Sequence, residues 1–279
     1  MRVIDLKKVT KSVKEAVIKI NYNLDTSLVS LLRKAKENET DNISKSILDD
    51  IIQNQDIAKK GKVPLCQDTG VVVVFLEIGF EVSFSGDIYE AINEGVRQGY
   101  KEGYLRKSIV NHPFNRVNTL DNTPAIIHTK LVKGNKIKLK IAAKGGGSEN
   151  MSKVTMLTPA DGIEGVKKLV LDTIFNAGGK PCPPIIVGIG IGGNLEKSAL
   201  LAKEALLRNL DDSNEDEIIM SLENDLYREI NKLGVGPMGV GGETTCLAVK
   251  INYYPMHIAS LPVAINIQCH SSRHTEVLI

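Results

Sequence analysis

Four cysteines, Cys66, Cys182, Cys246 and Cys269, are the side chains of this sequence best suited to bind a soft metal. None of them belongs to a Cys-x-x-Cys pair, so the chain forms neither a local zinc ribbon nor a thioredoxin-like motif. A metal site would therefore take its ligands from segments far apart in the sequence. For each cysteine taken alone, burial as a small hydrophobic side chain stays open as the alternative.

Two of the cysteines lie in loops with unusual neighbours. Cys66 is followed by Gln67 and Asp68, so that a thiolate donor, an amide and a carboxylate are consecutive just before a strand-like run. Cys182 is enclosed by prolines in the segment 179–184, which also precedes a strand-like run. Because loops at strand ends commonly carry the chemistry of α/β proteins, both segments are candidate site loops.

The other two cysteines differ from each other in their surroundings. Cys269 ends the last strand-like run, and His270, two serines and Arg273 follow it. Cys246 lies inside a strand-like run and is expected to pack in the core. Nothing in the sequence indicates a secreted protein, so the even number of cysteines does not predict disulfides.

Two glycine-rich segments have both a functional and a structural interpretation. Residues 188–193 satisfy Gly-x-Gly-x-x-Gly between an expected strand and an expected helix, as in dinucleotide-binding proteins. The second strand, with an acidic residue about 20 positions further on, is missing, and a tight strand-to-helix turn is the alternative. Residues 234–245 lack the Lys-Ser/Thr ending of a phosphate-binding loop, so they form either a site wall or a complicated connection.

The hydrophobic pattern predicts an α/β fold with α+β character: mixed sheets with flanking helices and an all-helical region over residues 1–60. We expect a single domain over residues 1–279. The helices and strands are predicted from apolar spacing, capping residues and glycine stops. Helices are expected near 9–20, 28–32, 43–52, 87–103, 160–177, 195–210 and 215–233, and strands near 71–78, 125–131, 137–143, 183–189, 245–252 and 262–268, with 125–131 and 137–143 as a hairpin.

Composition excludes several classes of protein. The chain has 279 residues, with 35 Lys and Arg against 33 Asp and Glu, which gives no electrostatic basis for binding nucleic acid or an anionic membrane. It has no Trp, and no apolar run approaches the roughly 18 residues of a membrane span. The charged N-terminus does not resemble a signal peptide. We therefore expect a cytoplasmic protein without nucleic-acid or membrane partners.

The order of these motifs resembles the α subunit of class I, iron–sulfur-dependent fumarate hydratases and of the related L-tartrate dehydratases. Six segments carry the resemblance and span nearly the whole chain. They are CQDTG at 66–70, KGGGSEN at 144–150, GGKPCPP at 178–184, GIGIGG at 188–193, GVGPMGVGGETT at 234–245 and CHSSRH at 269–274.

The resemblance implies a [4Fe–4S] cluster held by Cys66, Cys182 and Cys269, with one iron left without a protein ligand. Cys246 has no ligand role in this match. Three thiolates leave an iron open to a substrate oxygen, whereas four suit electron transfer. An open iron acts as a Lewis acid on a hydroxyl or carboxylate group.

The resemblance also implies a set of residues that handle a small dicarboxylate. Gln67 and Asp68 are expected to line the substrate site, with Asp68 orienting the proton-handling group rather than binding iron. Arg106 is expected to bind a substrate carboxylate, and Gly146 to contact the substrate through its backbone. His257 is expected to contact the substrate and, with Asp68, to act in catalysis. Without the resemblance, the sequence would predict that His257 is a buried core histidine.

The implied activity is the reversible hydration of fumarate to (S)-malate, with dehydration of L-tartrate to oxaloacetate as the alternative. In the family a further region supplies arginines, a lysine and the catalytic threonine base. This chain ends at Ile279 without that region. We therefore expect a separate β subunit that carries it as a C-terminal domain, in a hetero-oligomer such as a dimer of α–β pairs.

Two functions of other classes remain as alternatives. A non-catalytic iron–sulfur carrier would need a fourth thiolate, which only Cys246 could supply. A nucleotide-binding oxidoreductase would use residues 188–193, against which the missing second strand argues.

Overall fold

The computed structural model describes all 279 residues, which pack as two compact units. The first unit comprises Met1–Leu24, Asn54–Gly146 and Arg273–Ile279, and the second comprises Asp25–Gln53 and Gly147–Ser272. Both contain helices and a four-stranded mixed sheet, so the predicted α/β class with a helical N-terminal region is confirmed. The expectation of a single domain over residues 1–279 stays a prediction.

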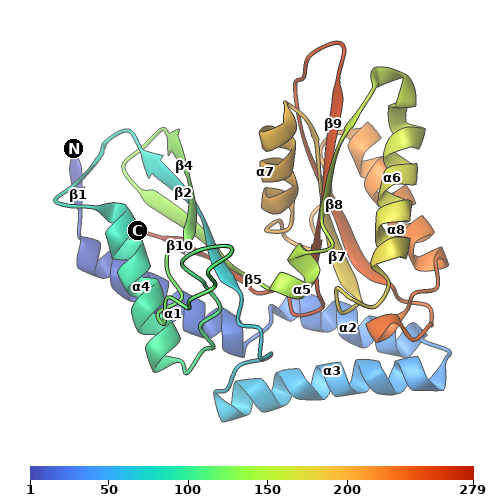
Figure 1. The fold of residues 1–279 in the computed structure, drawn as a ribbon, viewed down its shortest axis with the longest axis horizontal. Coiled ribbons are helices and arrows are strands. Elements are labelled where there is room, and N and C mark those ends of the chain that lie inside the picture. Colours follow the sequence, from blue (N-terminus) through green and yellow to red (C-terminus); the bar gives the residue numbers. More distant parts are fainter. The chain divides into compact units, whose positions relative to one another are not determined.

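The first unit is built on a sheet with the strand order β10-β5-β2-β4, against which α1 and α4 pack (Figure 1). Alternate side chains of β2, Val72, Val74 and Leu76, face the core shared with both helices. A small parallel pair, β1 with β3, accompanies the sheet. The elements are β1 (Arg2–Ile4), α1 (Leu6–Tyr22), β2 (Val71–Gly79), β3 (Val82–Phe84), α4 (Ile88–Glu102), β4 (Ile126–Val132), β5 (Ile137–Lys144) and β10 (His274–Leu278).

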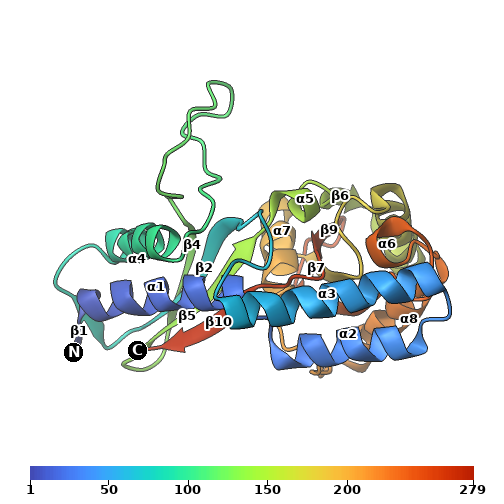
Figure 2. The same cartoon turned by 90° about the horizontal axis from the view of Figure 1, so that it is seen from below.

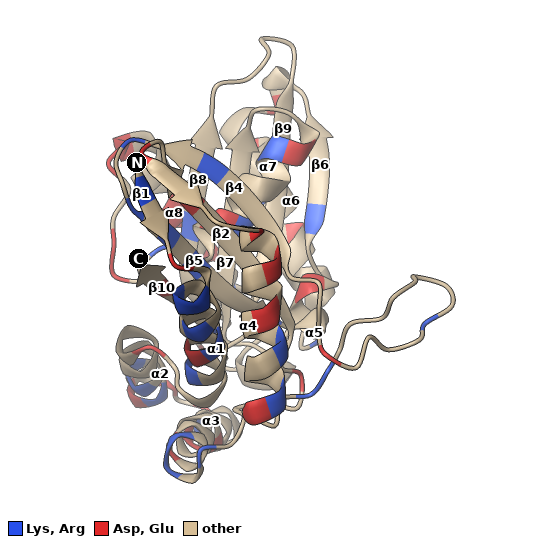
Figure 3. Ribbon diagram, turned by 90° about the vertical axis from the view of Figure 1, so that its left-hand side faces the viewer, with Lys and Arg blue, Asp and Glu red and all other residues tan.

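Aspartate caps begin the two helices of this unit. The Asp5 carboxylate accepts a hydrogen bond from the backbone N–H of Lys7, and Asp87 accepts from Tyr89 and Glu90. These bonds satisfy N–H groups that have no partner within the helix. Both helices carry their charged residues away from the core, with α1 mainly basic and α4 mixed in sign (Figure 3).

The predicted hairpin of β4 and β5 is wrong, because β2 lies between these strands. β2 runs parallel to β4 and antiparallel to β5. The chain beyond β2 occupies the gap at the turn, where the N–H groups of Gly79, Phe80 and Glu81 donate to the carbonyls of residues 136, 132 and 134. The turn of residues 133–136 therefore wraps around the end of β2 instead of joining paired neighbours.

The second unit is built on a sheet with the strand order β6-β9-β7-β8. The helix α7 covers one face, while α6 and α8 pack on the other (Figure 1). The elements of the sheet layers are β6 (Lys153–Leu157), α6 (Gly162–Ala177), β7 (Ile185–Gly192), α7 (Leu195–Ala205), α8 (Glu217–Lys232), β8 (Cys246–Tyr254) and β9 (Leu261–Gln268). Short helices are α5 (Gly146–Glu149), η1 (Pro159–Asp161) and η2 (Pro237–Gly239).

Two further helices precede this sheet in the sequence. They are α2 (Thr26–Asn38), which Asp25 caps, and α3 (Asn42–Gly61), which begins in the second unit and ends in the first. No helix of the chain has the length and apolar character needed to cross a membrane.

The Gly-x-Gly-x-x-Gly segment belongs to a strand, because Gly188 and Gly190 lie inside β7 and face α7. A Cβ atom at Gly188 would lie 2.3 Å from the carbonyl oxygen of Ala202, and one at Gly190 would lie 2.0 Å from that of Ser198. The glycines thus allow the helix to approach the sheet closely. Only Gly192 and Gly193, both with positive φ, form the expected turn into α7. This packing accounts for the motif without a nucleotide.

Candidate functional site

In the first unit, the loop 66–70 presents Cys66 and Gln67 to the solvent just before β2. Both side chains are exposed, and the backbone N–H of Asp68 lies 3.4 Å from the Cys66 sulfur. Thr69, which follows, is buried, and its hydroxyl donates to the carbonyl of Arg106 at 2.6 Å. The loop is therefore anchored at Thr69, and it presents the thiol of Cys66 and the amide of Gln67 to the solvent.

The Asp68 carboxylate is held by two backbone N–H groups. Oδ2 accepts from Gly146 at 2.7 Å and Oδ1 accepts from Gly70 at 3.1 Å. A Cβ atom at Gly145 would lie 3.0 Å from Oδ2 of Asp68 and 3.4 Å from Nη2 of Arg273, so a larger residue would crowd both groups. The structure thus brings together two predicted site residues, Asp68 and Gly146, which are 78 positions apart.

Arg106 lies beside the same loop through its backbone, while its side chain is exposed. It lies near the start of the long segment between α4 and β4, which extends away from the rest of the first unit (Figure 2). The hydroxyl of Tyr100 lies 2.7 Å from the carbonyl oxygen of Thr69 and 3.0 Å from that of Gly70. Burial raises the pKa of Tyr100, which stays a neutral donor that fixes the loop.

In the second unit, Cys182 lies in a strained loop between α6 and β7. Its φ of 57° is in the left-handed region, which non-glycine residues rarely adopt. Its N–H donates to the carbonyl of Gly179 at 3.1 Å, and the carbonyl of Pro183 accepts from Met238 at 2.9 Å. Such strain persists only where surrounding contacts enforce it, and it is frequent at functional sites.

Cys269 lies at the end of β9, and the next residue joins it to the Cys182 loop. The carbonyl of Cys182 accepts from the backbone N–H of His270 at 3.3 Å and from Nδ1 at 3.0 Å. Since a carbonyl can only accept, Nδ1 carries the proton. The second unit therefore brings two of the three predicted ligand loops together, through a histidine to which sequence reasoning gave no role.

The glycine-rich segment 234–245 supports the Cys182 loop rather than lining a recognisable phosphate site. Besides the bond from Met238, the N–H of Glu243 donates to Glu39, whose carboxylate is buried and also accepts from Thr40 and Asp41. The segment thus links the Cys182 loop to the connection between α2 and α3.

His257 is not brought together with the cysteines of its own unit. It lies in the exposed loop between β8 and β9, where Nδ1 accepts from the N–H of Ala259 at 3.1 Å. Cys269 lies at the other end of β9, and eight residues of strand span about 25 Å. The alternative of a buried core histidine is wrong, because the side chain is exposed.

Cys246 is fully buried in β8, as expected for a packing residue. Burial raises the pKa of its thiol to about 12, which opposes formation of the thiolate that binds iron. None of the four cysteines forms a disulfide. Neither unit by itself gathers three or more His, Cys, Asp or Glu side chains in an arrangement that would hold a metal ion.

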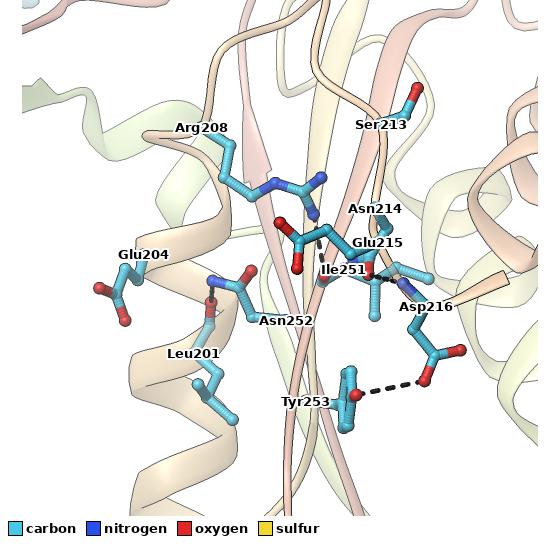
Figure 4. A pocket seen from close by; sticks show the side chains of 10 residues that line it. All are labelled: Leu201, Glu204, Arg208, Ser213, Asn214, Glu215, Asp216, Ile251, Asn252 and Tyr253. Atoms are coloured by element: carbon cyan, nitrogen blue, oxygen red, sulfur yellow. Dashed lines mark hydrogen bonds between the residues drawn. The ribbon is translucent and has the colours of Figure 1, made fainter. Parts of the chain in front are cut away.

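A separate cavity of the second unit, with a volume of about 450 Å³, contains none of the predicted site residues (Figure 4). It lies between the end of α7, the following loop and β8. Arg208, at the wall of the cavity, donates to both carboxylate oxygens of Asp212 and to Glu223. Tyr253 donates to Asp216 at 3.1 Å. The charged lining residues are Arg208 against Glu204, Glu215 and Asp216, and this acidic excess does not favour a dicarboxylate.

Comparison with known proteins identifies relatives along nearly the whole chain. Residues 10–278 match the family model described as Fumarate hydratase (Fumerase). A protein of Methanocaldococcus jannaschii, named "Putative L(+)-tartrate dehydratase subunit alpha", is 45% identical over 257 residues, which cover 90% of each chain. The Escherichia coli O157:H7 protein named L(+)-tartrate dehydratase subunit alpha is 28% identical over 276 residues, covering 98% of this chain and 91% of that one.

The matched residues include the loops of Cys66, Cys182 and Cys269, and the similarity to the archaeal relative extends well beyond these motifs. The resemblance read from the motifs is therefore confirmed: the chain belongs to the fumarate hydratase (Fumerase) family.

Proposed function

We propose that this chain is the cluster-binding α subunit of a hydro-lyase that acts on a small dicarboxylate. The observation that carries the proposal is the hydrogen bond between Asp68 and Gly146, which joins two family motifs beside the exposed Cys66. Family membership supports the reaction class. The names of the relatives, each an α subunit, support a separate β subunit as partner.

The proposal assigns Cys66, Cys182 and Cys269 as the ligands of a [4Fe–4S] cluster. The donor set suits that group, because all three cysteines lie in loops outside any disulfide, while Cys246 is enclosed in the core. A cluster with three thiolate ligands supplies a Lewis acid through its open iron. The exposed Gln67 and Arg106 then bind the substrate, with Arg106 pairing with a carboxylate.

Asp68 has the role of orienting the proton transfer. Its carboxylate is fixed by the N–H groups of Gly70 and Gly146, so it can hold a neighbouring donor in one direction. The base that removes the proton, together with further cations for the substrate, belongs to the β subunit in this proposal. The isolated chain should therefore show less than about a hundredth of the activity of the complete enzyme, since several positioned groups are missing together.

Between the two expected substrates, the names of the relatives favour L(+)-tartrate over fumarate. Dehydration of tartrate removes a hydroxyl group from one carbon and a proton from its neighbour, which gives the enol of oxaloacetate. Fumarate hydration uses the same groups in reverse and remains the second candidate, supported by the description of the family.

Kinetics of the reconstituted complex decide between these functions. The chain is loaded anaerobically with iron and sulfide, combined with the proposed β subunit, and assayed with L(+)-tartrate, fumarate and (S)-malate. We expect the highest kcat/KM with L(+)-tartrate. A higher value with fumarate and malate would reverse the assignment of substrate, and no turnover of any of the three at full cluster content would overturn the hydro-lyase.

A further inference from the structure

Arg273 is a buried cation without an ion pair. Its side chain belongs to the first unit and is 3% exposed. Nη1 donates to the carbonyl of Asp68 at 2.6 Å and to the Oδ1 atom of Asn21 at 3.0 Å. Nε has no hydrogen-bond partner. A charge is expensive to bury in this way, so the position calls for an explanation beyond stability.

Asn21, the partner of Arg273, is completely buried near the end of α1. Its amide is fixed in one orientation, because Nδ2 donates to the carbonyl of Val17 at 2.9 Å. Its own backbone carbonyl accepts from the N–H of Leu65 at 2.8 Å. One residue therefore touches both Arg273 and the start of the Cys66 loop.

These contacts close a frame around Cys66 and Gln67. The frame runs from Leu65 through Asn21 and Arg273 to Asp68, so that both ends of the loop are anchored while the two residues between them stay exposed. A loop anchored at both ends presents its side chains in one direction with little loss of entropy on binding.

We propose that Asn21 and Arg273 are positioning residues that hold Cys66 and Asp68 in the geometry needed for the reaction. The inference rests on the proposed function for the roles of Cys66 and Asp68. Arg273 also joins this frame to the third cysteine segment, since only three residues separate it from Cys269. Both hydrogen bonds come from one nitrogen, so an ammonium group with its three donors could replace them.

Hydrogen exchange of the chain without its cluster tests the frame directly. Arg273→Met keeps an unbranched side chain but removes the donors, and it should raise the exchange rates of the amides at 65–70 at least tenfold. Arg273→Lys should keep them within about threefold of the unchanged chain. Lys138→Met is the control, because Lys138 pairs with Glu77 on the same sheet and lies outside the frame. It should leave residues 65–70 unchanged.

Asn21→Ser provides a second variant in case Arg273→Met does not fold. It keeps the backbone bond to Leu65 and removes the side chain that orients Arg273, so the same amides should exchange several-fold faster. If residues 65–70 exchange at the unchanged rate in both Arg273→Met and Asn21→Ser, the frame does not hold the loop and the inference is wrong.

The assembled enzyme supplies the readout that distinguishes positioning from stability. At equal iron content, Arg273→Met should lower kcat at least tenfold with KM changed less than threefold, and Arg273→Lys should restore most of the loss. Equal kcat in all variants would overturn the inference while leaving the hydro-lyase intact. The variants could instead show faster exchange at 65–70 while the unchanged complex turns over no dicarboxylate. That result would support the frame and contradict the proposed function.

Discussion

The carbonyl oxygen of Cys182 accepts two hydrogen bonds from His270, one from the backbone N–H at 3.3 Å and one from Nδ1 at 3.0 Å. Because His270 follows Cys269 directly, the contact fixes the relative position of two loops that are 87 residues apart in sequence. The left-handed backbone of Cys182 gives its loop a defined shape. The second unit therefore presents two cysteines from one rigid edge of its sheet.

His270→Ala should weaken the contact that holds the loops of Cys182 and Cys269 together. The variant removes the bond from Nδ1 and keeps the one from the backbone, so the loss is that of one hydrogen bond, about 1 kcal/mol. We expect iron to leave the reconstituted chain several-fold faster, measured by the decay of visible absorbance with a chelator. His112→Ala, in the exposed segment of the first unit, is the control and should leave the rate unchanged. Equal rates for the two variants would show that the contact does not support the site.

Asp68→Asn should lower the turnover of the enzyme without lowering the amount of cluster that the chain binds. The amide keeps the shape of the carboxylate, but one of its two polar atoms is a donor and cannot accept from Gly146 or Gly70. We expect kcat of the complete enzyme to fall by up to about 10²–10⁴, the contribution of a proton transfer that Asp68 no longer orients. Iron per chain, measured in the same sample, should stay near its original value. Unchanged kcat would remove Asp68 from the site.

Arg106→Ala should weaken the use of dicarboxylates. The exposed guanidinium is free to pair with a substrate carboxylate, a contact worth about 1.5–3 kcal/mol, or about 10- to 150-fold in kcat/KM. Arg106→Lys keeps the charge and should recover part of the loss. Arg116→Ala, further along the same exposed segment, serves as the matched control. Equal kcat/KM in Arg106→Ala and the unchanged enzyme would contradict the role.

Cys246→Ala should reduce the sensitivity of the fold to alkaline pH. Burial raises the pKa of this thiol to about 12, from an ordinary value of 9.0. Between these values the thiol ionises only in the unfolded chain, so a rise in pH removes folding free energy at about 1.4 kcal/mol per unit. Below pH 9 the thiol is protonated in both states and contributes no slope.

Urea unfolding of the chain at pH 8, 9 and 10 measures this effect. At pH 10 the unchanged chain should have lost about 1.4 kcal/mol more than Cys246→Ala, relative to their values at pH 8. Parallel pH profiles for the two chains would show that the thiol ionises as readily in the fold as outside it.

Gly190→Ala should destabilise the second unit. The added Cβ would lie 2.0 Å from the carbonyl oxygen of Ser198, so α7 must move away from β7. Overpacking of this kind costs about 1–3 kcal/mol or more. Gly61→Ala, whose Cβ would meet only Val63 at 3.6 Å, is the control and should cost little. A thermal unfolding midpoint that is the same in both variants would contradict this account of the glycine motif.

Several elements were predictable because local signals agree with the packing. The run 71–78 is buried on both faces as β2, and the aspartates before α2 and α4 cap these helices. The error at β4 and β5 has a tertiary cause, since a turn sequence cannot show that a third strand lies between its neighbours. The same holds for β10, which was not predicted: its alternating pattern is short, and its partner β5 is far away in sequence.

Within the candidate site, motif residues were easier to find than the residues that support them. The loop of Cys66 was visible because three chemically distinct side chains are adjacent. Asn21 offered no signal, since an asparagine at the end of a helix is ordinary, and only the fold brings it to Arg273. The position of His257 relative to Cys269 could be seen only in the fold, where His257 lies on an exposed loop at the other end of β9.

The central claim is that three of the four cysteines hold a [4Fe–4S] cluster, and iron content tests it most directly. Each cysteine is changed singly to serine, the chains are reconstituted anaerobically, and iron per chain is measured with the visible absorbance. We expect about four irons in the unchanged chain and in Cys246→Ser. Cys66→Ser, Cys182→Ser and Cys269→Ser should each lose stable incorporation. Loss of the cluster in Cys246→Ser, with full retention in any one of the other three, would contradict the account.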